Sequence, residues 1–289
     1  MKRVIALAGI VTVLTACGST AETPPTPPPA PEISLPAENP GPGEHAQAIV
    51  HGGVRRDYTV HAPPAYRPGL PLVLVLHGQP GTSAEVAQRS GFNPVADRAG
   101  FLAVYPQGFG NRWDVGTVGD PGSGDVGFLA GLIDHLVSVW GADRARVYVT
   151  GFSAGAAFSY RLARELPGRF AAIAPVSGKM DPVPAWQSPL GPDNRVSVLT
   201  FQGGRDLIAS AWSATNDGWR AAAGCGTPKL TTVRNARGVA DREVASCANG
   251  TEHVVYALRT MGHEWPNAVE HPVAGSDLIW EFFSRHRLP

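Results

Sequence analysis

The stretch Val147-Tyr-Val-Thr-Gly-Phe-Ser-Ala-Gly-Ala-Ala157 places a serine between two glycines. The residues before Ser153 are mostly apolar and β-branched, which favours a buried strand, and the run 154–165 after it favours a helix. Small residues at this junction permit a strained turn and a close approach of strand and helix. The stretch therefore predicts a strand–turn–helix unit in which Ser153 is a candidate nucleophile. The alternative is a glycine-rich turn with a buried serine.

Strands and helices alternate on both sides of this unit. This order predicts an α/β fold, with a mostly parallel central sheet and helices on both faces. We find no internal repeat and no second domain. The glycine pair Gly52-Gly53 indicates a hairpin of strands 48–51 and 58–61, and Asp125 is the expected N-cap of a long helix. Further strands are expected at 72–76, 101–105, 146–150, 170–174, 196–201 and 254–258, and helices at 84–90, 93–98, 126–140, 154–165, 212–223 and 276–285.

The composition fits one large globular core. The 289 residues are 43% hydrophobic and 17% charged, and the formal net charge is zero. A neutral balance gives no electrostatic reason to expect nucleic acid or an anionic membrane surface as a partner. The oligomeric state is not predicted.

The N-terminus has the pattern of a targeting signal. Lys2 and Arg3 precede an apolar run from Val4 to Ala16, which is too short to span a bilayer but suits a signal peptide over residues 1–16. The sequence Leu14-Thr-Ala-Cys-Gly18 resembles the bacterial lipobox, which implies lipidation of Cys17 and a membrane-anchored protein outside the cytoplasm. Ordinary secretory cleavage near Ala16 is the alternative.

Prolines dominate the next segment, between Thr20 and Gly43. They favour extended polyproline II structure over helix or sheet. We therefore expect a disordered linker over residues 17–44, acting as a stalk, and a catalytic domain over residues 45–289. A ligand for a proline-binding domain is the weaker interpretation of the linker.

Two cysteines remain in the domain, Cys225 and Cys247. In a secreted protein a single pair indicates one disulfide. Two cysteines without neighbouring Cys or His partners do not complete a tetrahedral metal site. No metal and no organic cofactor is implied.

A serine hydroxyl attacks only when a base accepts its proton and donors hold the oxyanion. The expected strand 72–76 ends in His77-Gly-Gln-Pro-Gly81, and a loop at this place supplies one backbone N–H of an oxyanion hole. The expected donors are the N–H groups of Gln79 and Ala154. His77 precedes the serine at the end of a core strand, where an orienting, hydrogen-bonded role is the better interpretation.

The base and the acid are expected after the serine in the chain. His263 follows the last expected strand, in a loop where catalytic residues cluster, and His271 is the runner-up. Asp206 follows the strand 196–201 closely enough to reach the imidazole, and Asp181 and Asp193 are its rivals.

Several segments together resemble the secreted α/β-hydrolase family of polyhydroxybutyrate depolymerases and feruloyl-esterase-type enzymes, including actinobacterial esterase lipoproteins. The resemblance covers about residues 53–286 and implies a serine esterase with roles on Ser153, Asp206 and His263; the family's cysteine pair supports a Cys225–Cys247 bond. The segment after the acid departs from the family, with Leu207-Ile-Ala-Ser in place of Val-Pro-Tyr, so the acyl group does not carry over. The matching motifs are Leu76-His-Gly78, Ala96-Asp-Arg-Ala-Gly-Phe101, Val104-Tyr-Pro-Gln-Gly108, Asp125-Val-Gly-Phe128, Arg146-Val-Tyr-Val-Thr-Gly-Phe-Ser-Ala-Gly155, Arg169-Phe-Ala-Ala-Ile-Ala-Pro-Val-Ser-Gly178, Gly262-His263 and Trp265-Pro266.

The segment 178–196 is too short for a large cap domain, which favours an open site and polymeric or bulky ester substrates. Trp113, Trp265 and His77 are candidates for the substrate-binding wall, with core packing as the alternative for the tryptophans. Rival functions are an acyltransferase or serine peptidase of the cell envelope, and a non-catalytic envelope-binding lipoprotein.

Overall fold

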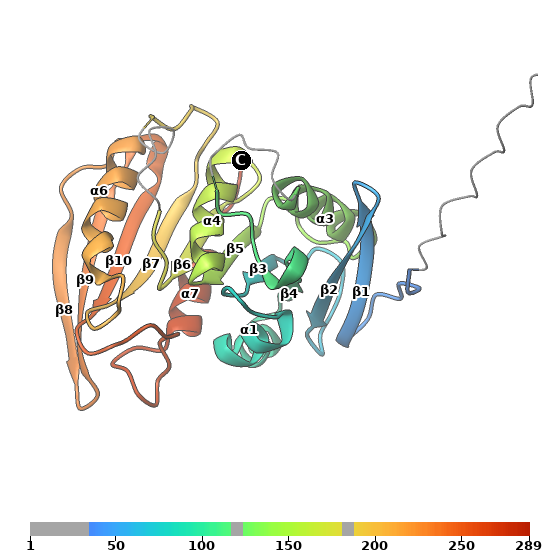
Figure 1. The fold of residues 1–289 in the computed structure, drawn as a ribbon, viewed down its shortest axis with the longest axis horizontal. Helices are drawn as coiled ribbons and strands as arrows, with labels where there is room; N and C mark the ends of the chain where they lie inside the picture. The colour runs from blue at the N-terminus through green and yellow to red at the C-terminus, as the bar shows by residue number, and fades with distance from the viewer. Residues whose placement is uncertain (1–34, 117–123, 181–187) are drawn as a thin grey trace, which may run out of the picture. The chain divides into compact units, whose positions relative to one another are not determined.

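A computed structural model describes residues 35–116, 124–180 and 188–289. Their strands form one sheet in the order β1-β2-β4-β3-β5-β6-β7-β10-β9-β8 (Figure 1). The central strands from β4 to β10 in this order are parallel, and an antiparallel pair flanks them at each edge. The strands are β1 (Gly43–His51), β2 (Val54–Ala62), β3 (Leu72–Leu76), β4 (Leu102–Pro106), β5 (Val147–Phe152), β6 (Ala172–Val176), β7 (Ser197–Gly203), β8 (Lys229–Asn235), β9 (Gly238–Ser246) and β10 (Glu252–Leu258).

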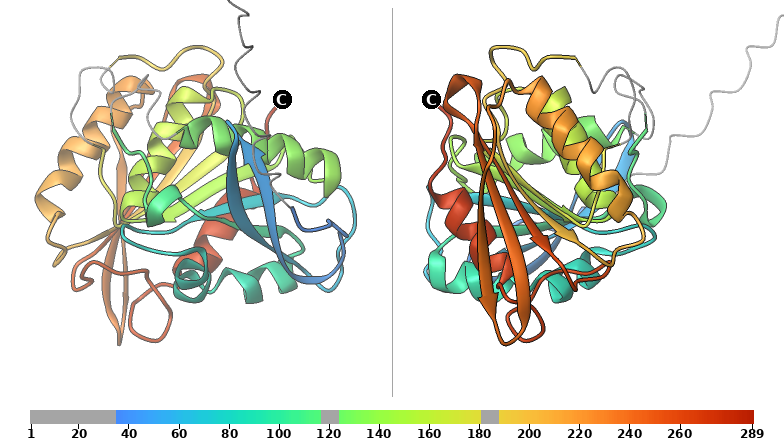
Figure 2. Two further views of the ribbon diagram at one scale, coloured as in Figure 1. Left: turned by 45° about the vertical axis from the view of Figure 1, so that its right-hand side comes forward. Right: turned by 90° about the vertical axis from the view of Figure 1, so that its left-hand side faces the viewer.

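Helices cover both faces of the sheet, as predicted. One core contains apolar side chains of α3, α4 and α6, and the other contains those of α1, α2 and α7. In the right-hand view of Figure 2, α6 and α7 lie on opposite sides of the strands. The helices are α1 (Ser83–Ser90), α2 (Phe92–Ala99), α3 (Asp125–Val139), α4 (Ala154–Glu165), α6 (Trp212–Ala222) and α7 (Gly275–Ser284), with short 3-10 turns η1 (Phe109–Asn111), η2 (Ala209–Ala211) and η3 (Ala248–Gly250).

Successive side chains of a central strand point to opposite faces of the sheet, and both sets are apolar, so helices pack on both faces. Leu72, Leu74 and Leu76 of β3 belong to one core, whereas Val73 and Val75 belong to the other. A strand buried on both faces appears in sequence as a continuous apolar run, which is why the central strands were predictable.

Strands β8 and β9 were not predicted. Every residue of β8 is exposed, and its sequence Lys-Leu-Thr-Thr-Val-Arg-Asn contains no apolar run. β8 pairs only with β9, which in turn pairs with β10. Because these strands lie toward the edge of the sheet, few of their side chains are buried, and their sequences lack the apolar run that predicts a strand.

The folded domain begins earlier than the expected boundary at residue 45. β1 starts at Gly43, and the carboxylate of Glu38 accepts hydrogen bonds from Tyr58 (2.9 Å) and the Trp140 indole (2.7 Å). Glu38 also contacts His135 at 2.5 Å. Residues from Glu38 onward therefore pack on the domain, although they lie within the expected linker 17–44. The expected signal peptide and Cys17 lie outside the described residues.

Asp125 is not an N-cap. The cap position is Gly124, and no side chain caps the helix there. Asp125 is instead buried inside the first turn, where it pairs with the buried Arg56 (2.6 Å) and accepts a hydrogen bond from the Asp114 amide (2.9 Å). A buried carboxylate needs such partners, and sequence spacing does not show them.

The expected disulfide is present. Cys225, just after α6, is bonded to Cys247, just after β9. The bond therefore joins a helix on one face of the sheet to the antiparallel strands at its edge.

Candidate active site

Ser153 lies at a sharp turn between β5 and α4. Its backbone has φ 55° and ψ −114°, in the half of the map that residues with a Cβ atom rarely adopt. A Cβ atom on Gly155 would come within 2.5 Å of the Leu76 carbonyl oxygen, and one on Gly151 would collide with Gly155. The two glycines of the motif are therefore required by close backbone packing. The strained turn holds the Ser153 hydroxyl at the carboxyl end of the sheet.

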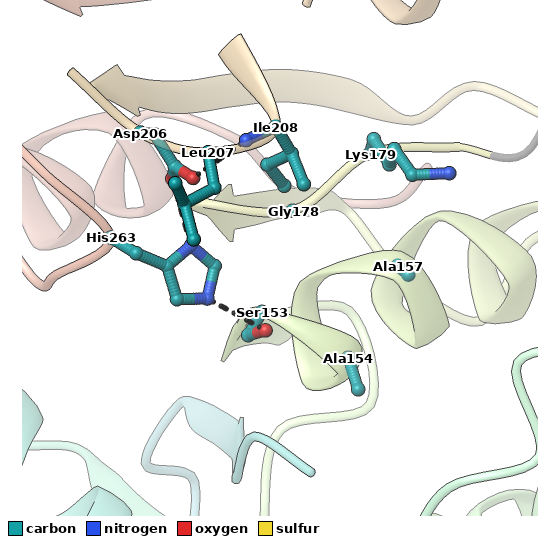
Figure 3. Close-up of a pocket in the computed structure, with 9 residues that line it drawn as sticks. All are labelled: Ser153, Ala154, Ala157, Gly178, Lys179, Asp206, Leu207, Ile208 and His263. Carbon is teal, nitrogen blue, oxygen red and sulfur yellow. Dashed lines mark hydrogen bonds and ion pairs between the residues drawn. The ribbon is translucent and has the colours of Figure 1, made fainter. Parts of the chain in front are cut away.

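A chain of hydrogen bonds connects Ser153, His263 and Asp206 (Figure 3). His263 Nε2 lies 2.9 Å from Ser153 Oγ, and His263 Nδ1 lies 2.8 Å from Asp206 Oδ2. The Asp206 side chain is fully buried and its other oxygen accepts the Ile208 amide at 3.0 Å. An Nδ1–H that donates to the carboxylate leaves the Nε2 lone pair facing the serine hydroxyl. Nε2 can then accept the serine proton.

The three residues follow three separate strands, all at the carboxyl end of the sheet. Ser153 follows β5, Asp206 follows β7 and His263 follows β10. Parallel strands with these neighbours bring their carboxyl ends together. The structure thus brings together the three residues that chain order and strand position indicated.

The expected oxyanion donors flank the same serine. Ala154 is the first residue of α4, and Gln79 lies in the loop after β3. Among the described residues, neither amide has a hydrogen-bond partner. The N–H groups at a helix start have no partner within the helix and carry partial positive charge. Both amides are free to donate to a bound ligand.

His77 and Trp113 fix the loop that carries Gln79. Burial lowers the pKa of His77, so its ring is neutral. Its Nδ1–H donates to the Gly78 carbonyl (2.7 Å), and its Nε2 accepts the Gly108 amide (3.0 Å). Trp113 Nε1 donates to the His77 carbonyl (2.9 Å). The orienting interpretation of His77 matches these contacts.

Both tryptophans pack in the core, the alternative interpretation, and neither lines the two cavities at Ser153. Trp113 and Trp265 are 3% and 4% exposed. Trp265 donates to Ser276 (2.9 Å) and packs edge-on against Phe92. Two large aromatic rings beside a site are stabilised more by burial in the core than by contact with solvent. His77, 1% exposed, borders a cavity but acts through the loop.

Two cavities meet at Ser153 and His263. The larger, of about 330 Å³, has a floor of small residues and a rim that includes Leu207, which is 95% exposed. The smaller, of about 140 Å³, lies between the Gln79 loop and one face of α1. The larger cavity is lined by Ser153, Ala154, Ala157, Gly178, Lys179, Asp206, Leu207, Ile208 and His263 (Figure 3).

Sequence reasoning missed Leu207 and Ile208 as lining residues. The signal was available, because they stand directly after the acid, where the sequence departs from the family pattern. The contribution of Glu85 and Arg89 to the smaller cavity was also missed. Nothing in the sequence of α1 distinguishes them from ordinary exposed helix residues.

The rival residues have other partners or positions. His271 is buried, accepts the Asn267 amide (3.2 Å) and contacts Glu264 (3.2 Å). Asp193 borders a hollow that contains neither Ser153 nor His263. Asp181 lies outside the described residues.

Two features are absent from the part of the chain that the structure describes. Residues 35–116, 124–180 and 188–289 contain no cluster of three or more His, Cys, Asp or Glu side chains arranged to hold a metal ion. Among the same residues, no helix is both long enough and apolar enough to cross a membrane.

The strand order and the covering helices are those of the α/β-hydrolase fold. Residues 57–182 match the family model described as "Esterase PHB depolymerase". This match confirms the resemblance that the sequence motifs indicate.

Individual relatives also carry esterase names. The chain is similar to "Putative esterase NocK" of Nocardia uniformis subsp. tsuyamanensis, at 36% identity over 171 residues (56% of this chain and 48% of that protein). It is also similar to the bifunctional acetylxylan esterase/xylanase XynS20E of Neocallimastix patriciarum, at 34% identity over 128 residues (44% of this chain and 18% of that protein). The chain thus spans about half of the first relative and less of the second.

A solved structure supports the fold. The acetyl xylan esterase from Aspergillus awamori superimposes with a TM-score of 0.61 at 18% identity, covering 79% of this chain and 94% of that one. At this identity the likeness concerns the fold alone.

Proposed function

We propose that this protein is a serine esterase that hydrolyses carboxylic esters through an acyl-enzyme on Ser153. The observation that carries the proposal is the continuous hydrogen-bonded chain Ser153–His263–Asp206 at the meeting point of two cavities. The family match and the esterase names of the relatives support the same class of reaction.

The first half-reaction acylates the serine. Ser153 Oγ attacks the ester carbonyl carbon while His263 Nε2 takes its proton, and the buried Asp206 carboxylate stabilises the resulting imidazolium. The amides of Gln79 and Ala154 donate hydrogen bonds to the carbonyl oxygen as it becomes an oxyanion. Collapse of the tetrahedral intermediate breaks the bond to the alcohol oxygen, which leaves with the proton from His263.

The second half-reaction releases the acid. Water enters the site vacated by the alcohol, and His263 removes its proton as it attacks the acyl carbonyl. The intermediate collapses with Ser153 Oγ as leaving group, and His263 returns the proton to it. The protein needs only its own residues for these steps.

The larger cavity suits the acyl group. Ala154, Ala157 and Gly178 leave space beside the nucleophile, and Leu207 and Ile208 supply apolar contacts. About 330 Å³ accommodates groups from acetyl to an aromatic acyl. We therefore propose acetyl, hydroxyalkanoyl and feruloyl esters as the substrate types to compare.

A fluorophosphonate probe tests the nucleophile. We expect the wild-type protein to be labelled and Ser153→Ala to remain unlabelled. Ser159→Ala is a matched control, because Ser159 is a buried serine of α4 that donates to the Gly155 carbonyl. Equal labelling of Ser153→Ala and wild type would contradict the proposal, as would no labelling of the wild type; a non-catalytic lipoprotein would give the latter result.

A substrate panel separates the esterase from its rivals. It contains short and long p-nitrophenyl esters, methyl ferulate, acetylated xylan, polyhydroxybutyrate and peptide amides. We expect ester hydrolysis to dominate. Faster amide cleavage would indicate a peptidase, and predominant transfer to added alcohols over water would indicate an acyltransferase.

We further propose that the protein acts outside the cytoplasm, anchored by a lipid on Cys17. The lipobox-like sequence supports the anchor, and the Cys225–Cys247 disulfide supports an oxidising compartment. Wild-type protein is expected in the membrane fraction, whereas Cys17→Ala is expected in the soluble fraction. A soluble wild-type protein would contradict the anchor.

A further inference from the structure

Three residues other than glycine have a positive φ in the part of the chain that the structure describes, and the nucleophile Ser153 is one of them. A second, Ser177, has φ 49° and directly follows β6. A residue with a Cβ atom is strained in this conformation, whereas a glycine is not. Such strain persists only where the surrounding structure over-determines it, so the contacts of Ser177 show what the strain serves.

The main chain around Ser177 packs against the turn that carries the nucleophile. The Ser153 amide donates a hydrogen bond to the carbonyl of Val176, at 3.0 Å. A Cβ atom on Gly178 would lie 2.6 Å from the Ser153 carbonyl oxygen, so the two segments touch on the other side of Ser177 as well. The Ser177 amide donates to the Phe201 carbonyl in β7, at 3.0 Å. The backbone of Ser177 is therefore fixed relative to Ser153.

The hydroxyl of Ser177 contacts the loop that carries the base. Its Oγ donates to the carbonyl oxygen of Glu264, the residue after His263, at 3.0 Å. Ser177 is fully buried, so this bond is shielded from competing water. A glycine would adopt the same backbone without strain but could not make this bond. One side chain thus connects the segment beside the nucleophile to the main chain beside the base.

The main chain of His263 has no hydrogen-bond partner of its own. Among the described residues, neither its amide nor its carbonyl is bonded. Before it, the Arg205 amide donates to the Met261 carbonyl at 2.9 Å. After it, the first main-chain group that is held is the Glu264 carbonyl, and its donor is Ser177. Loss of the Ser177 hydroxyl therefore releases the chain on one side of His263.

We propose that Ser177 is a positioning residue that sets the distance between His263 and Ser153. Its main chain is fixed to the nucleophile turn and its hydroxyl to the base loop, so one residue connects the two reacting groups. Proton transfer from Ser153 Oγ to His263 Nε2 depends on their 2.9 Å contact. A misplacement of about 1 Å can cost about 10²-fold in rate. This inference rests on the proposed esterase function.

Two variants remove the hydroxyl, and they differ in backbone strain. Ser177→Ala keeps the Cβ atom, whereas Ser177→Gly also relieves the strain of the positive φ. On p-nitrophenyl acetate we expect each variant to lower kcat about tenfold and to leave KM within about twofold of wild type, because the bond acts on the base and not on the substrate. The rate of fluorophosphonate labelling should fall by the same factor, since His263 must also take the Ser153 proton there. The buried Trp265 ring keeps the loop folded in both variants.

Thr150→Val is the matched control. Thr150 is a fully buried residue of β5, and its hydroxyl donates to the Ala174 carbonyl of β6 at 2.5 Å. The variant therefore loses the same kind of bond without a contact to the base loop. Its melting temperature should fall, as in Ser177→Ala, but its kcat should stay within about twofold of wild type. An equal loss of kcat in Thr150→Val would show that activity follows stability, and would overturn the proposal.

Two further outcomes would also overturn the positioning role. One is a wild-type kcat in both Ser177 variants. The other is a wild-type kcat in Ser177→Gly alone, because the backbone conformation and not the hydroxyl would then matter. In both cases the wild type still hydrolyses the ester, so only the role of Ser177 is contradicted. If the wild type hydrolyses no ester and Ser153 does not label, the proposed function itself is contradicted.

Discussion

The Trp113 indole donates a 2.9 Å hydrogen bond to the carbonyl oxygen of His77, the residue directly after β3. The two rings are also in contact, tilted by 32° with centroids 4.8 Å apart. His77 in turn holds Gly78 and the Gly108 amide, so the indole supports the loop that presents the Gln79 amide. A buried tryptophan outside the substrate cavities is thereby connected to the oxyanion site.

We expect Trp113→Phe to reduce kcat more than it changes KM. Phenylalanine retains the stacking on Phe158 but leaves the His77 carbonyl without its donor. The loop then holds the Gln79 amide less precisely in place. We expect kcat on p-nitrophenyl acetate to fall about tenfold, which is less than the effect of removing an oxyanion donor itself. Trp280→Phe is the control, because Trp280 stacks on Phe101 away from this loop. Equal kcat in both variants would contradict the connection.

Asp206→Asn tests the orientation of His263. The amide cannot accept the Nδ1–H as a carboxylate does, so the imidazole loses its correct tautomer and the stabilisation of its charged form. We expect kcat to fall by about 10³- to 10⁴-fold with little change in KM, measured on the same ester. Asp193→Asn serves as the control. A comparable loss in that variant, or a loss of less than tenfold in Asp206→Asn, would argue for another acid.

The sequence predicted the residues whose roles depend on chain order and strand position. Ser153, Asp206 and His263 each follow a buried strand, and buried strands are visible as apolar runs. The cavity walls were less predictable, because contacts such as that of Arg89 with Phe152 join residues distant in the chain. Trp113 illustrates the limit, since an aromatic residue near a site in sequence can face the substrate or the core. Only the hydrogen bond to His77 shows which.

The disulfide is expected to stabilise the domain without serving catalysis. Cys225 and Cys247 are separated by 22 residues, and neither lines a cavity at Ser153. We expect the double variant Cys225→Ser/Cys247→Ser to lose roughly 3 kcal/mol of unfolding free energy in urea titrations. Its kcat at 25 °C should stay within about twofold of wild type, because the loop constraint acts mainly on the unfolded chain. A catalytic defect at full stability would show instead that the bond shapes the site.

His253 makes the stability of the domain sensitive to acid. It lies in β10, where burial and the nearby Arg220 lower its pKa from 6.5 to about 3. Its Nε2 has no hydrogen-bond partner among the described residues, and its Nδ1 accepts from Arg220 at 3.3 Å. Between pH 6.5 and about 3, His253 is therefore protonated in the unfolded chain but remains neutral in the folded chain. Stability is complete above pH 6.5 and falls as the pH drops through this window.

Urea unfolding as a function of pH measures this contribution. Between pH 7.5 and 4.5 we expect His253 to account for about 2–3 kcal/mol of lost unfolding free energy. His253→Asn retains an acceptor for Arg220 but cannot be protonated, so its unfolding free energy should decline less steeply over the same range. His45→Asn is a control, because His45 lies in β1 with its ring only partly buried, and its pH profile should follow the wild type. A group with equal pKa values in the folded and unfolded states adds no pH dependence to folding. Identical profiles for His253→Asn and wild type would therefore show that burial does not lower the pKa of His253.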